Sequence, residues 1–86
     1  MTIQWDEKAK SHFDLIITHL PQFHKSIAEQ LVKEKSEELA ETRGSESVEE
    51  TDVITAFFQE VPPAFKDMMK RLMHKQGIDY SQYIKD

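Results

Sequence analysis

The sequence predicts an all-α fold, a compact bundle of four main helices followed by a short C-terminal helical turn. Apolar residues recur at spacings of three and four through most of the chain, which is the period of a helix with one buried face. The 3 prolines and 2 glycines separate these apolar stripes. No stretch alternates between apolar and polar residues as a half-buried strand does. We therefore expect residues 1–86 to form a single helical domain.

The first predicted helix begins after Asp6, a suitable N-cap, and ends at Pro21. Pro21 also suits the first turn of a second helix, which runs to about Arg43 and ends at Gly44 in a left-handed C-cap. Lys35 narrows the apolar face of this second helix. The residues expected to be buried are Ala9, Phe13, Ile16, Ile17 and Leu20 in the first helix, and Phe23, Ile27, Ala28, Leu31, Val32 and Leu39 in the second.

The third predicted helix opens with Ser47 and Glu50, which have the spacing of a capping box. Pro62 and Pro63 break it and start a fourth helix, which ends at Gly77. The expected buried stripes are Val53, Ile54, Ala56, Phe57, Phe58 and Val61, then Phe65, Met68, Met69, Leu72 and Met73. Helical spacing of Tyr80, Tyr83 and Ile84 predicts one docked turn in the tail.

Composition excludes several classes of protein. The chain has 86 residues and no cysteine, so it is neither a disulfide-stapled module, nor an iron–sulfur protein, nor a thiolate zinc finger. No apolar run is long enough to cross a bilayer, and we expect a cytoplasmic location. No nucleophile motif, phosphate-binding glycine loop or metal-ligand spacing among the 4 histidines is present, which favours a non-catalytic protein without a metal.

Charge is distributed unevenly along the chain. Residues 29–60 carry ten acids and three bases, whereas residues 62–77 carry four bases and one acid. The fourth helix is therefore a basic amphipathic helix, of the kind that binds acidic partners. Its methionines form either part of the core or part of an interface. The candidate partner-binding residues are Lys66, Met69, Lys70, Arg71, Met73 and His74.

An ordered set of short motifs lies between residues 4 and 57. It comprises Trp5-Asp6 with Ala9, Leu20-Pro21-x-Phe23 with Lys25, Glu29, Ala40, Arg43-Gly44, Val48-Glu49 and Asp52-Val53. This set resembles the small C-terminal helical domain of light-independent (dark-operative) protochlorophyllide reductase, which defines a family of reductase-like helical domains. The basic helix and the tyrosine-containing tail at residues 62–86 lie outside the resemblance.

The resemblance implies a role in chlorophyll biosynthesis without the reductase activity itself. That reductase moves electrons through iron–sulfur clusters that cysteines hold on larger domains, and this chain has no cysteine. It implies instead a module that binds a protein partner, such as a larger reductase-type complex, or a tetrapyrrole as its one candidate cofactor. The implied binding residues are Trp5, Phe23, His24 and Lys25. Trp5 is either a lid on the core or a stacking surface for the tetrapyrrole.

Two other functions stay open. A long helix ending in Arg43-Gly44, followed by a helix with the pattern Val-Glu-x-x-Asp-Val-x-x-Ala-Phe, is similar to a helix pair of the histone fold. A nucleic-acid-associated protein is one alternative, although a net charge of −5 and the acids around residues 46–52 oppose contact with phosphates. An accessory subunit that completes the active site of an enzyme complex is the other. The sequence does not define the oligomeric state.

Overall fold

The computed structural model describes residues 3–20, 22–78 and 80, and of residues 22–24 the backbone alone. Four α-helices dominate it, and they are α1 (Glu7–Thr18), α2 (Gln22–Thr42), α3 (Glu50–Glu60) and α4 (Lys66–Lys75). A single 3₁₀ turn, η1 (Pro63–Phe65), directly precedes α4. Two short strands, β1 (Gln4–Trp5) and β2 (Ser47–Val48), complete the described elements. The prediction of an all-α fold with four main helices is confirmed.

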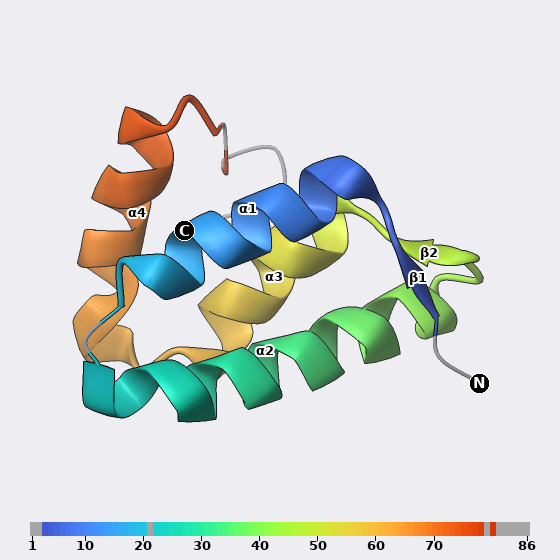
Figure 1. Cartoon of the computed structure of the whole chain (residues 1–86), viewed down its shortest axis with the longest axis horizontal. Coiled ribbons are helices and arrows are strands. Elements are labelled where there is room, and N and C mark those ends of the chain that lie inside the picture. Colours follow the sequence, from blue (N-terminus) through green and yellow to red (C-terminus); the bar gives the residue numbers. More distant parts are fainter. Residues whose placement is uncertain (1–2, 21, 79, 81–86) are drawn as a thin grey trace.

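The helices form a small bundle around α3. The most extensive helix–helix contact is between α2 and α3, and α3 also packs against α1. Figure 1 shows α4 standing at the end of the bundle where α1 ends and α2 begins, while β1 and β2 lie at the opposite end. All four helices contribute to one hydrophobic core. The length of α2 therefore connects two different ends of the molecule.

The strand pair joins segments that are far apart in the sequence. Gln4 aligns with Ser47 and Trp5 with Val48 in a parallel pairing. The backbone N–H of Asp6 extends this pairing, because it donates to the carbonyl of Val48 at 2.8 Å. The apolar pattern of the sequence predicts no strand here, since each strand has only two residues and depends on a partner more than forty positions away.

The helix ends agree with the sequence in part. Gly44 and Gly77 have φ angles of +77° and +78°, the left-handed conformation that a glycine C-cap requires. The capping box of α3, however, is formed by Glu49 and Asp52. The predicted box of Ser47 and Glu50 is wrong, because Ser47 belongs to β2 and the helix begins two residues later.

The predicted buried stripes of α1 and α3 are confirmed throughout. In α2 the prediction is wrong for Ile27 and Leu31, which are 60% and 41% exposed, whereas Val32 is fully buried. The reason is length: α2 has 21 residues and α3 has 11, so α3 covers only part of α2. In the tail, the ring of Tyr80 lies 5.6 Å from that of Phe58. Tyr83 and Ile84 lie outside the described residues, as does Pro21.

Candidate functional site

An ion pair anchors the corner between α2 and α3. Arg43 donates from Nη2 and Nε to the two carboxylate oxygens of Asp52, at 2.7 and 3.2 Å. Asp52 is 3% exposed and also accepts the backbone N–H of Glu49, at 2.9 Å. The hydrogen bonds from Arg43 to Asp52 and Glu49 raise the pKa of the guanidinium above its ordinary value. Because both oxygens of Asp52 are used within the chain, we assign this corner a structural role.

An apolar groove lies at the opposite end of α2. The exposed Ile27 and Leu31 are four residues apart, so they occupy the same face of the helix. The groove has a volume of about 110 Å³ and extends from these residues toward the end of α3 and η1. Its lining comprises Leu20, Ile27, Ala28, Leu31, Glu60, Val61, Pro62 and Phe65, of which only Glu60 is charged.

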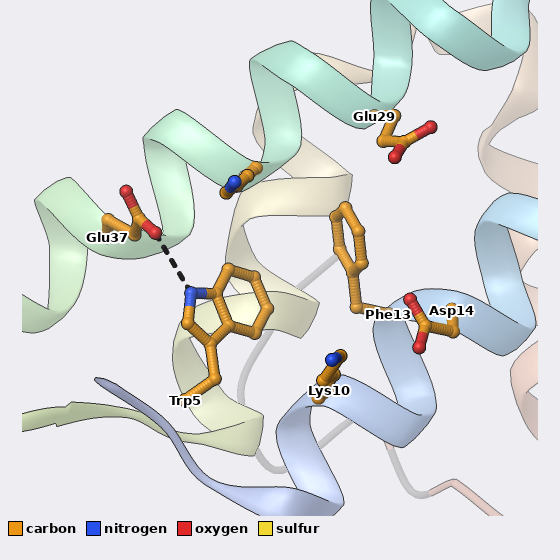
Figure 2. A pocket seen from close by; sticks show the side chains of 7 residues that line it. Trp5, Lys10, Phe13, Asp14, Glu29 and Glu37 are labelled. Atoms are coloured by element: carbon orange, nitrogen blue, oxygen red, sulfur yellow. Dashed lines mark hydrogen bonds between the residues drawn. The ribbon is translucent and has the colours of Figure 1, made fainter. Parts of the chain in front are cut away.

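A second hollow, which we call the aromatic cleft, lies between α1 and α2 near β1. It has a volume of about 310 Å³ and is lined by Trp5, Lys10, Phe13, Asp14, Glu29, Lys33 and Glu37. Trp5 and Phe13 meet edge to face, with ring centroids 5.2 Å apart. The indole N–H of Trp5 donates to Oε2 of Glu37 at 2.9 Å, as Figure 2 shows. This bond fixes the indole between β1 and the C-terminal half of α2.

The residues that the resemblance groups with Trp5 do not meet it in one site. Trp5 contacts α2 at Glu37, which is twelve residues after Lys25. At a rise of 1.5 Å per residue, these two positions are about 18 Å apart along the helix. Lys25 is half-buried near the start of α2, and the side chains of Phe23 and His24 lie outside the described residues.

The basic helix α4 divides its candidate residues between core and surface. Met69 and Met73 are fully buried, so their assignment to a partner-binding surface is wrong. They occupy the inner face because α4 needs its apolar stripe to close the bundle. Arg71 and His74 are exposed, whereas Lys66 and Lys70 are half-buried. The surface of α4 that a partner could reach is therefore charged and not methionine-rich.

Of the remaining histidines, His12 is closest to a carboxylate. Its Nδ1 lies 3.1 Å from Oε1 of Glu50, at the distance but not the angle of a hydrogen bond. Across residues 3–20, 22–78 and 80, no three His, Asp or Glu side chains gather closely enough to hold a metal ion. In the same residues, no helix has the length and apolar character needed to cross a membrane.

The fold and the two hollows along α2 define the class of protein: a small helical domain with surfaces suited to binding. A family model described as "Protein of unknown function (DUF2621)" matches residues 1–85, so the chain belongs to the DUF2621 family. No curated protein sequence and no solved structure matches the chain. The resemblance to the protochlorophyllide reductase domain therefore stays a prediction.

Proposed function

We propose that this chain is a non-catalytic protein-binding module whose apolar groove receives an amphipathic helix with basic flanks. The observation that carries the proposal is the exposure of Ile27 and Leu31 beside a hollow lined almost entirely by apolar side chains. Two large apolar residues one helical turn apart, facing a groove, match the anchor spacing of helix-in-groove recognition. Scattered exposed apolar residues are ordinary, but these two adjoin a continuous apolar lining.

Charge argues for a basic partner. Glu60 lines the groove, and Glu34 follows Leu31 by three residues on the exposed face of α2. The segment that supplies the walls from α2 and α3, residues 29–60, carries ten acids against three bases. Lys35, one of these bases, is already paired with Glu38 at 3.7 Å. Lysine or arginine on the flanks of the partner helix would therefore be attracted to this rim.

A second copy of the chain is a poorer occupant. The only basic amphipathic helix among the described elements is α4, and its apolar residues Met69 and Met73 are fully buried in the chain's own core. A second copy could offer α4 to the groove only by withdrawing it from that core. The partner that fits is a different protein, and a larger enzyme complex in the cytoplasm remains the setting that the resemblance implies.

The structure gives less support to the other two expectations. Five of the seven residues that line the cleft beside Trp5 are charged, which suits the apolar face of a tetrapyrrole poorly. For nucleic acid, the exposed bases of α4 adjoin a molecule whose net charge is −5. Tetrapyrrole binding and nucleic-acid association stay predictions.

A peptide titration tests the proposal. Two helical peptides of equal length carry leucines at i, i+3, i+4 and i+7, one with lysine flanks and the other with glutamate flanks. We expect the lysine peptide to bind with a dissociation constant of about 10–100 µM. Backbone NMR shifts should then concentrate at Ile27, Leu31, Val61 and Phe65. The glutamate peptide should bind at least tenfold more weakly.

Variants decide whether the groove is the binding surface. The double change Ile27→Glu and Leu31→Glu should abolish binding without unfolding the chain, because both side chains are substantially exposed. Glu29→Gln, a residue of the aromatic cleft, is the matched control and should bind as the unchanged chain does. Equal binding by the double variant, or no binding below about 1 mM, would reject the proposal. Sedimentation velocity of the chain alone tests the competing occupant, and a dimer lost in the double variant would favour a second copy.

A further inference from the structure

The aromatic cleft is separate from the groove and has features of a ligand site of its own. Its volume of about 310 Å³ is at the lower end of the range for small-molecule pockets, which is roughly 300–1,000 Å³. Trp5 and Phe13 supply an apolar wall, and their edge-to-face contact keeps both rings in place. Glu37 holds the indole through its N–H, so the orientation of the wall is set before any ligand arrives.

Four more charged side chains line this cleft, two from each helix. Lys10 and Asp14 come from α1, whereas Glu29 and Lys33 come from α2. Apart from Glu37, the cleft thus has two positive and two negative groups. Within the part of the chain that the structure describes, none of these four side chains forms a hydrogen bond or an ion pair. Figure 2 shows Asp14 and Glu29 on facing helices beside Phe13, with Lys10 between Phe13 and Trp5.

The charges change sign along the cleft. Each acid is four residues from a base on its own helix, which separates opposite charges by about 6 Å along the axis. A free dipeptide places its ammonium and its carboxylate at a similar distance, since an extended residue spans at most about 3.3–3.6 Å. A single α-amino acid is too short for this separation, and a fully anionic or fully cationic ligand would leave one pair of groups unmatched.

From this arrangement we infer that the aromatic cleft binds a zwitterionic ligand of dipeptide size with an apolar side chain. Asp14 and Glu29 receive its ammonium group, Lys10 and Lys33 receive its carboxylate, and Trp5 and Phe13 contact its side chain. This inference does not depend on the helix-binding groove, since Ile27 and Leu31 line a different hollow.

Trp5 provides the test because it is the only tryptophan of the chain. Leucyl-leucine is titrated into the full chain while the Trp5 emission is followed, and calorimetry repeats the titration so that a silent fluorophore is not mistaken for absence of binding. We expect saturable binding, at least tenfold weaker for leucine alone and for leucyl-leucine with an acetylated N-terminus and an amidated C-terminus. No saturation by about 10 mM in either measurement, or equal binding of the blocked dipeptide, would overturn the inference.

Variants locate the ligand. Glu29→Gln and Lys33→Gln should each weaken binding of the free dipeptide by tenfold or more, because each removes one charge that meets a ligand terminus. Glu34→Gln, an exposed residue of α2 that does not line the cleft, is the control and should leave the affinity unchanged. A porphyrin titration under the same conditions examines the tetrapyrrole prediction. Competition by porphyrin, with no effect of Glu29→Gln or Lys33→Gln on dipeptide binding, would contradict a zwitterion site.

Discussion

The two halves of α2 have similar apolar patterns but different surroundings. In the C-terminal half, Val32, Ser36 and Ala40 are fully buried, and the pair of Arg43 with Asp52 anchors the end of the helix. In the N-terminal half, Ile27 and Leu31 are substantially exposed beside the groove. The difference teaches that the C-terminal half stabilises the fold, whereas the N-terminal half leaves apolar surface for a partner.

The sharpest test of this comparison places the same charge in each half. Val32→Asp buries a carboxylate without a partner, which costs several kcal/mol, so we expect a loss of more than about 4 kcal/mol or failure to fold. Ile27→Asp sets the charge in solvent and should change the free energy of unfolding by about 0.5 kcal/mol or less. Urea denaturation followed by circular dichroism measures both. Equal losses would show that the two halves are not different.

The corner of Arg43 and Asp52 should be the next most sensitive position. Asp52→Ala removes the carboxylate that caps α3 and pairs with Arg43, and loss of the cap alone costs about 1 kcal/mol. We expect a total loss larger than that, measured by urea denaturation. Glu49→Ala is the comparison, because Glu49 is exposed and bonds only one guanidinium nitrogen. If Glu49→Ala destabilises as much as Asp52→Ala, burial of Asp52 is not what matters.

A polar defect in the buried half of α2 offers a stabilising change. The hydroxyl of Ser36 is fully buried, and no described residue bonds it. A buried unsatisfied polar group costs about 1–3 kcal/mol, so Ser36→Ala should raise the free energy of unfolding by about 1 kcal/mol. Ser26→Ala, at an exposed position of the same helix, controls for the higher helix propensity of alanine. A gain no larger than that of Ser26→Ala would mean that the hydroxyl has a partner.

Local patterns in the sequence were sufficient for most of the fold. Periodicity identified the helices, and the buried stripes of α1 and α3 follow directly from it. Glycine chemistry gave the two left-handed C-caps at Gly44 and Gly77. These features depend on residues within one or two turns of each other, which is the range over which sequence reasoning is reliable.

The candidate sites depended on tertiary contacts that no local pattern contains. Ile27 has the spacing of a core residue, and only the shortness of α3 leaves it exposed. Met69 and Met73 had two interpretations until the position of α4 decided for the core. Trp5 was singled out in the sequence, but its bond to Glu37 spans 32 positions. A signal for the cleft did exist, since Glu29, Lys33 and Glu37 recur every fourth residue on one face of α2.

The smallest expected effect concerns the one contact by which Trp5 reaches the buried half of α2. Trp5→Phe keeps an aromatic ring against Phe13 but removes the N–H that Glu37 accepts. Since the bond is only partly buried, we expect the free energy of unfolding to fall by about 0.5–1 kcal/mol. The double-mutant cycle with Glu37→Ala, measured by urea denaturation, isolates the bond from the change in ring size. A coupling energy of zero would mean that the ring contact alone positions Trp5, and the pre-set wall of the aromatic cleft would then rest on Phe13.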